Sequence, residues 1–321
     1  MRRLTAAPSP AQLKAEVERL APGAAGQRLG VAVSGGADSL ALLKLAAEAF
    51  PGQLDAWTVD HGLRAESGDE ARAVAAICAS IGVPHEILPI DGTIRGGDLQ
   101  AQAREARYRA MARQAEARGV AALITAHHAD DQAETLLMRL NRGSGLAGLS
   151  GIRAVEHLHG VAVLRPLLAF RRKMLRTVLD GTGWPIAEDP SNLDERFDRT
   201  RVRRLLARGG LHAGAAVQSA AHLAEAEAAL QWVVERAWES RRREDGALDL
   251  EGLPDEIARR LLARAFAALG ATPRGAAVAR LWARGGGTLA GFRATARDGL
   301  WRLAPAPPRR GRVWTGGGAR A

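Results

Sequence analysis

The sequence predicts an α/β fold, in which a doubly wound parallel sheet is followed by a second, smaller α+β domain. Over the first two-thirds of the chain, short apolar runs alternate with helical patterns, as they do where helical crossovers join parallel strands. After about residue 210 the pattern changes to helical stretches that precede short strand-like pieces. A chain of 321 residues is long enough for two domains, and we expect them at residues 1–210 and 211–321.

The individual elements follow from this alternation. The opening segment is predicted to be a helix with Ser9 as its N-cap and Pro10 in its first turn. Apolar runs predict strands at residues 28–34, 53–61, 84–91, 120–128 and 161–168. Helices are expected after Asp38 and at residues 66–81, 100–118, 130–141 and 171–179. In the second domain, helices at 212–240, 254–269 and 273–284 precede strand-like pieces at 288–294, 299–303 and 311–315.

Composition and charge narrow the class of protein. The chain is 47% apolar and 25% charged, a balance that excludes wholesale disorder. No apolar run approaches the roughly 20 residues of a membrane helix, and the start lacks the apolar core of a signal peptide. The lone Cys78 fits a reducing compartment, so we expect a cytoplasmic protein without a membrane partner. The 45 basic residues exceed the 35 acidic ones, which favours a polyanionic partner such as nucleic acid.

The segment Ser34-Gly35-Gly36-Ala37-Asp38-Ser39 is the most informative in the chain. An apolar strand ends at its serine, and a helix begins at once. Glycines allow a tight turn, and the unpaired N–H groups of a helix start favour a phosphate. The two hydroxyl groups add donors, whereas a carboxylate beside phosphates indicates an intervening cation, so Asp38 is assigned to Mg²⁺. The alternative is a plain strand–turn–helix connection.

Two other nucleotide-binding motifs are excluded by their context. No lysine follows a glycine-rich loop, so the chain has no Walker A element. Residues 143–148 match G-x-G-x-x-G literally, but they follow a helix rather than a strand.

The phosphate-binding segment resembles the loop of the PP-loop ATP pyrophosphatase superfamily, and further motifs narrow the resemblance. They follow in unbroken order across residues 28–208: Val59–Ser67, Ala103–Tyr108, Thr125–Thr135, Arg142–Gly145, Arg165–Leu168 and Glu188–Asn192. Together they resemble the tRNA(Ile)-lysidine synthetases. The C-terminal region resembles the extra tRNA-binding domain of that family more weakly.

This resemblance implies a two-step reaction. ATP adenylates the carbonyl oxygen of the wobble cytidine in an isoleucine tRNA with a CAU anticodon, and pyrophosphate leaves. The side-chain amine of L-lysine then attacks carbon 2 of the base, and AMP leaves. Residues 34–39 then bind ATP, together with His61 after the second strand. The motifs leave both a monomer and a homodimer open.

Acidic side chains near the fourth strand suit the lysine substrate, whose ammonium has an ordinary pKa near 10.4. His127, Asp131 and Glu134 are spaced four and three apart, so they share a face if the helix begins early. Asp131 and Glu134 are assigned to the lysine, one of them as general base, and His127 to the phosphates. With Asp38, these three form the expected catalytic set.

Two other interpretations of this cluster stay open. Acids are common at a helix start for the sake of the helix dipole alone. A metal site could also use His127, His128, Asp130 and Asp131.

An RNA substrate needs positive charge and stacking surfaces. We assign tRNA contact to Arg64 after the second strand, to Arg104, Arg107 and Tyr108 on the third helix, and to Arg199, Arg201 and Arg203. The last group could contact the adenylate instead. Three alternatives remain. Residues 61 and 64 could lie in a plain surface turn, and the arginines on the helices could be merely solvated. Tyr108 could pack in the core.

Three rival functions share parts of this pattern. A tRNA thiolase usually needs a reactive cysteine or a cysteine-held cluster, whereas Cys78 lies alone in an apolar helical stretch. The basic charge and the additional domain argue against an amide ligase for small molecules. The intact segment at 34–39 argues against a catalytically dead RNA-binding protein.

Overall fold

The computed structural model describes residues 6–60, 67–90, 99–187, 198–207 and 212–307. The chain folds into two compact units, Met1–Ala224 and Glu225–Ala321. This division falls within the helix α9 (Ala213–Arg241), whereas the expected boundary at 210/211 lies outside the described residues.

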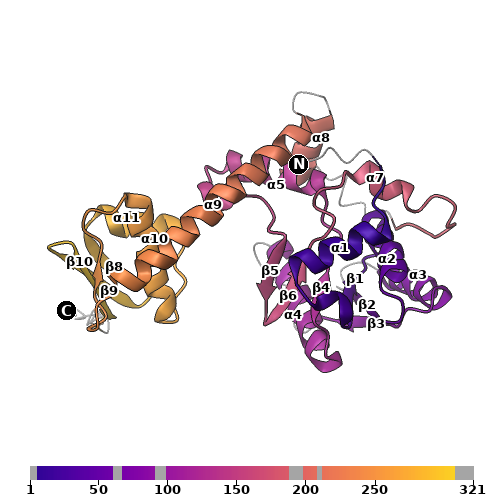
Figure 1. Cartoon of the computed structure of the whole chain (residues 1–321), viewed down its shortest axis with the longest axis horizontal. Helices are drawn as coiled ribbons and strands as arrows, with labels where there is room; N and C mark the ends of the chain where they lie inside the picture. The colour runs from indigo at the N-terminus through magenta and orange to yellow at the C-terminus, as the bar shows by residue number, and fades with distance from the viewer. Residues whose placement is uncertain (1–5, 61–66, 91–98, 188–197, 208–211, 308–321) are drawn as a thin grey trace, which may run out of the picture. The chain divides into compact units, whose positions relative to one another are not determined.

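A mixed but mainly parallel sheet forms the centre of the first unit (Figure 1). Its described strands are β1 (Leu29–Ala32), β2 (Leu54–Asp60), β3 (His85–Pro89), β4 (Ala122–Ile124), β5 (Val155–Leu158) and β6 (Val161–Leu164). They lie in the order β3-β2-β1-β4-β6-β5, and each adjacent pair is parallel except the antiparallel pair β5/β6. The predicted doubly wound parallel sheet is confirmed, with β5 as an additional edge strand that the prediction missed.

Helices cover both faces of this sheet. The described ones are α1 (Pro10–Leu20), α2 (Ala37–Ala49), α3 (Ser67–Ser80), α4 (Leu99–Arg118), α5 (Ala129–Asn141), α6 (Leu146–Leu149), α7 (Arg172–Thr177) and α8 (Asp198–Ala207), with a 3₁₀ turn at Ala24–Gly26. The predicted cap of α1 is present, because Gln12 donates its backbone N–H to Ser9 Oγ over 3.2 Å. None of the helices in the described ranges is long and apolar enough to cross a membrane.

The core explains a glycine in the middle of β1. Leu29 and Val31 pack with residues of α1, α2, α3 and α7 on one face of the sheet. On the other face, Trp57 packs with residues of α4, including Tyr108. A Cβ at Gly30 would lie 2.6 Å from the Trp57 ring, so only glycine leaves room for the indole there.

The strand order defines a topological switch point. β1 lies between β2 and β4. The chain passes from β1 to β2 on one side of it, and β4 adds to the sheet on the other side. In open α/β sheets, ligands bind at the carboxyl ends of the strands at such a point. The segment 34–39 follows β1 and residues 125–131 follow β4, so the topology brings the two predicted site segments together.

The second unit is a small α+β domain, as predicted. The helices α10 (Asp255–Ala268) and α11 (Gly275–Ala283) pack against an antiparallel sheet in the order β7-β10-β9-β8. Its strands are β7 (Leu248–Asp249), β8 (Gly286–Leu289), β9 (Phe292–Arg297) and β10 (Leu300–Pro305). The strand expected at 288–294 is two strands, because Ala290 and Gly291 form a turn with φ of 49° and 83°. The strand expected at 311–315 lies outside the described residues.

Candidate active site

The segment between β1 and α2 forms a loop that is closed by serine hydrogen bonds. Ser34 donates its backbone N–H to Ser39 Oγ over 3.1 Å, and Ser39 Oγ donates to the Gly36 carbonyl over 2.9 Å. Gly35 has a φ of 82°, a conformation that favours glycine. Gly36 is the N-cap of α2 and supplies no side-chain hydrogen bond. The first N–H groups of α2 therefore remain available for an anion.

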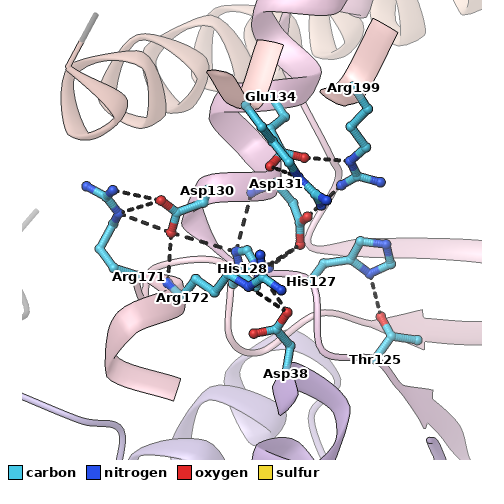
Figure 2. A network of polar contacts seen from close by, with 11 residues as sticks. Asp38, Thr125, His127, His128, Asp130, Asp131, Glu134, Arg171, Arg172 and Arg199 are labelled. Carbon is cyan, nitrogen blue, oxygen red and sulfur yellow. Dashed lines mark hydrogen bonds and ion pairs between the residues drawn. The ribbon is translucent and has the colours of Figure 1, made fainter. Parts of the chain in front are cut away.

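Asp38 lies in the first turn of α2 and faces cationic groups from two other segments (Figure 2). Its Oδ2 is 3.4 Å from His128 Nε2 and 3.3 Å from Arg172 Nε. Burial alone would raise the pKa of Asp38, but His128, Arg172 and Arg176 together hold that pKa below its ordinary value. Its Oδ1 is buried and accepts no hydrogen bond from the described residues. An ionised carboxylate oxygen without a partner fits the protein ligand that Mg²⁺ takes beside phosphates.

His128 is the N-cap of α5, a role that the sequence analysis did not assign. Its backbone N–H donates to Asp131 Oδ2 over 3.0 Å, and Asp131 donates its N–H to His128 Nδ1 over 3.4 Å. Burial alone would lower the pKa of His128, but hydrogen bonding to Asp38 and the charges of Asp131, Asp38 and Asp130 raise it above its ordinary value. The three-residue spacing from histidine to an acid at a helix start was the signal in the sequence.

Asp131 and Glu134 lie together on one face of α5, and both pair with arginines from α8. Asp131 Oδ1 accepts from Arg199 Nη2 over 2.5 Å, and Glu134 Oε2 accepts from Arg199 Nε over 2.5 Å. Arg203 Nε donates to Glu134 Oε1 over 2.7 Å. Burial alone would lower the pKa of Arg199, but the two carboxylates raise it above its ordinary value. The acids assigned to lysine thus already bind cations, and two arginines assigned to tRNA lie at the site instead of on a free surface.

His127 lies between β4 and α5, outside the helix that carries the two acids. Its Nδ1 lies 2.9 Å from Thr125 Oγ1, within hydrogen-bond distance (Figure 2). Burial, followed by the charges of Arg165, Arg104, Arg199 and His128, lowers the pKa of His127 to about 3. The imidazole is therefore neutral at physiological pH and can donate or accept a hydrogen bond.

The remaining residues assigned to tRNA have different surroundings. Tyr108 is 4% exposed and packs in the core below Arg104, whose guanidinium lies 4.8 Å from the ring centre. Its assignment as a stacking surface for a base is therefore corrected in favour of the core alternative. Arg104 and Arg201 are exposed, and Arg107 is partly buried. His61 and Arg64 lie outside the described residues.

Comparison with known proteins identifies the family. A model of the PP-loop domain matches residues 10–209. The tRNA(Ile)-lysidine synthase of Novosphingobium aromaticivorans is 47% identical over 302 residues, which cover 88% of this chain and 90% of that protein. The chain belongs to the tRNA(Ile)-lysidine synthase family. The enzyme is therefore a ligase that modifies tRNA in an ATP-dependent reaction.

Two further members of the tRNA(Ile)-lysidine synthase family cover much of the chain. The Zymomonas mobilis protein is 47% identical over 248 residues, or 74% of this chain and 75% of its own length. The Methylobacterium nodulans protein is 43% identical over 318 residues, which cover 91% of this chain and 94% of that protein. A U34-tRNA thiolase from Methanococcus maripaludis, 19% identical, aligns with a TM-score of 0.55 over 67% of this chain and 78% of its own. That likeness concerns the fold alone.

The site of this family member contains no preformed metal cluster in the described ranges. No group of three or more histidine, cysteine, aspartate or glutamate side chains is arranged there to hold a metal ion. The alternative that used His127, His128, Asp130 and Asp131 as ligands is not supported, because Asp130 and Asp131 bind arginines.

Proposed function

We propose that the enzyme joins L-lysine to carbon 2 of the wobble cytidine of an isoleucine tRNA with a CAU anticodon. The products are lysidine, AMP and pyrophosphate. The observation that carries this proposal is the arrangement at the switch point, where an uncapped helix start lies beside a helix with two neighbouring carboxylates. The uncapped helix start suits a phosphate chain, and the two carboxylates suit an ammonium group.

In the first step, the carbonyl oxygen of the cytidine attacks the α-phosphorus of ATP. The bond to the bridging oxygen breaks, and pyrophosphate leaves into the loop at residues 34–39. The N–H groups of α2 and the hydroxyl groups of Ser34 and Ser39 bind its charge. Asp38 would hold Mg²⁺ through its unpartnered oxygen, and the ion would supply positive charge to the phosphates. His127 and His61 complete the ATP site.

In the second step, the lysine amine adds to carbon 2 and the bond from that carbon to oxygen breaks. AMP leaves with the oxygen. Asp131 and Glu134 bind the lysine ammonium, and one of them accepts the proton that the amine must lose before it can attack. Arg199 contacts both carboxylates and Arg203 contacts Glu134, so the arginines orient the two acids.

The tRNA is bound by basic groups from both units. In the first unit we assign Arg64, Arg104, Arg107 and Arg201 to the RNA. Residues 211–321 are assigned to the same substrate because they resemble the extra tRNA-binding domain of the family, and the net charge of +10 on the whole chain suits an RNA partner.

Sulfur transfer is disfavoured by the state of the single cysteine. Cys78 is buried in α3, and burial raises the pKa of its thiol to about 12. A thiolate is the nucleophile in such chemistry, so this residue is poorly suited to it.

Nucleoside analysis tests the proposed reaction. The enzyme is incubated with ATP, radiolabelled lysine and a transcript of the isoleucine tRNA, and the RNA is then digested. We expect one labelled nucleoside, formed with one AMP and one pyrophosphate per lysine incorporated. A transcript with uridine at the wobble position is the matched control and should incorporate none. Release of ADP, or AMP formation without labelled RNA, would contradict the proposal.

A further inference from the structure

Arg172, at the start of α7, lies against the ATP-binding loop without a role in the reaction described so far. We propose that Arg172 binds the phosphates of ATP and leaves Asp38 when the nucleotide enters, and that Asp130 positions it. This inference rests on the proposed use of residues 34–39 as the ATP site.

The start of α7 is fixed to the start of α5 by one carboxylate. Asp130 Oδ1 accepts from Arg171 Nε over 3.0 Å and from Arg171 Nη2 over 2.7 Å. Asp130 Oδ2 accepts the backbone N–H of Arg172 over 2.7 Å. Met174 and Leu175 are buried in the core of the first unit and anchor the rest of α7. The backbone of Arg172 is therefore held in place, while its side chain extends toward the loop (Figure 2).

The contact between Arg172 and Asp38 leaves polar atoms unsatisfied. Arg172 Nε lies 3.3 Å from Asp38 Oδ2, but it makes no hydrogen bond of acceptable geometry. Asp38 Oδ1 also lacks a partner among the described residues, and both atoms are buried. Buried polar groups are nearly always hydrogen-bonded in a finished site. The pair thus neutralises charge, but it retains donor and acceptor capacity that a ligand can use.

A phosphate chain is the ligand that fits this capacity. A guanidinium donates two parallel hydrogen bonds to a phosphate, and the carboxylate that it leaves is then free for the cation of ATP. Arg176 lies four residues further along the chain, at the end of α7, and its charge also acts on Asp38. The free N–H groups of α2 lie at the same loop. Lys173, the neighbour of Arg172, is exposed and makes no such contact in the described structure.

Nucleotide binding to single-site variants tests this assignment. Dissociation constants for ATP with Mg²⁺ and for adenosine are measured by calorimetry, without tRNA or lysine. Loss of charge-assisted hydrogen bonds predicts that Arg172→Gln weakens ATP binding by about tenfold to a hundredfold and leaves adenosine binding within about twofold. Arg172→Lys should recover part of the loss, and the control Lys173→Gln should bind ATP as the wild type does.

The positioning role of Asp130 is tested by ATP binding to single and double variants. Asp130→Asn should weaken ATP binding in the wild-type background, but add little in the Arg172→Gln background, because both changes act through the same side chain. Melting temperatures without nucleotide show whether each variant is folded. Equal ATP affinity in folded Arg172→Gln, or an equal loss for ATP and adenosine, would overturn the inference.

These outcomes separate the inference from the proposed reaction. If the wild type forms no lysidine but Arg172→Gln loses ATP affinity selectively, then the reaction is wrong and the inference holds. If lysidine forms and Arg172→Gln binds ATP normally, the inference alone is wrong.

Discussion

At the scale of single residues, the site consists of charges that compensate one another before any substrate is present. Asp38 faces His128 and Arg172, Asp130 binds Arg171, and Asp131 shares Arg199 with Glu134. In the proposed reaction a substrate therefore enters a site whose ionised groups are already paired with one another. This lowers the cost of keeping ionised groups partly buried in the free enzyme.

Asp38→Ala is expected to abolish ATP turnover while tRNA binding survives. Removal of the carboxylate eliminates the proposed ligand for Mg²⁺ and leaves Arg172 without its carboxylate partner, whereas His128 keeps Asp130 and Asp131 nearby. We expect AMP release to fall by about a hundredfold or more, the usual cost of losing one electrostatic contact to the transition state. AMP release and tRNA retention on filters are measured in parallel with Glu48→Ala, a change at an exposed acid on the same helix. Equal turnover in the two variants would contradict the assignment.

Glu134→Ala is expected to affect the lysine step selectively. Loss of a charge-assisted contact to the ammonium should raise the KM for lysine about tenfold or more. Pyrophosphate release from ATP and tRNA in the absence of lysine should stay within a few-fold of the wild type. The lysine dependence of product formation and the lysine-free release are measured separately. A defect that appears first in pyrophosphate release would place Glu134 at the nucleotide instead.

The neutral state of His127 predicts a dependence of stability on pH. In the unfolded chain this histidine takes up a proton near pH 6.5, whereas the folded state resists protonation down to a pKa of about 3. The contribution of His127 to folding is therefore present above pH 6.5 and is lost as the pH falls toward 3. Burial also lowers the pKa of His85, so this residue likewise makes folding less favourable as the pH falls. The pKa of His128 is raised, so its contribution to stability changes with pH in the opposite direction.

Urea unfolding at pH 7.5 and pH 5.5 tests this sign. His127→Asn should lose less free energy of unfolding between the two pH values than the wild type does. The exposed His157 provides the control, and His157→Asn should follow the wild type. If the free energy of unfolding of His127→Asn falls between pH 7.5 and pH 5.5 as much as that of the wild type, another group causes the pH dependence.

At the scale of elements, the alternation of apolar runs and helical patterns was enough to predict the parallel sheet. The elements that it missed are short or lie at edges. β5 spans four residues and pairs with β6 through a turn at His159 and Gly160, with φ of 50° and 85°. The density of arginines in α8 was visible in the sequence, but their pairing with Asp131 and Glu134 depends on packing between residues more than 60 positions apart. Tyr108 likewise needed the packing of α4 to be recognised as a core residue.

Gly30→Ala tests the packing of β1 against β2. The added methyl group would lie 2.6 Å from the Trp57 ring, so the indole must move within a closely packed core. Overpacking of this kind costs about 1–3 kcal/mol. The free energy of unfolding in urea should fall by that amount, whereas Gly26→Ala, with open space around it, should change it little. An unchanged stability for Gly30→Ala would show that Trp57 has room to shift.

At the scale of the whole molecule, the two units have separate cores, and the chemistry is assigned to the first. The PP-loop domain match ends at residue 209, so the tRNA-binding role proposed for residues 211–321 depends on the resemblance to the family and on charge. The sequence motifs singled out residues 34–39 and the acid pair, and the structure places these segments after the neighbouring strands β1 and β4. They assigned no role to Arg171 or Arg172 and offered His128 only as a metal ligand, because the contacts of these residues form only when the carboxyl ends of β1 and β4 come together.

The central claim is that the nucleobase itself is adenylated before lysine attacks it, and an oxygen label tests that step directly. A tRNA carrying ¹⁸O at the carbonyl oxygen of its wobble cytidine is incubated with ATP, lysine and the enzyme, and the AMP is analysed by mass spectrometry. Transfer of AMP to that oxygen, followed by cleavage of the bond to carbon 2, predicts that each AMP carries one ¹⁸O atom. Unlabelled AMP, released while lysine is incorporated, would contradict the account.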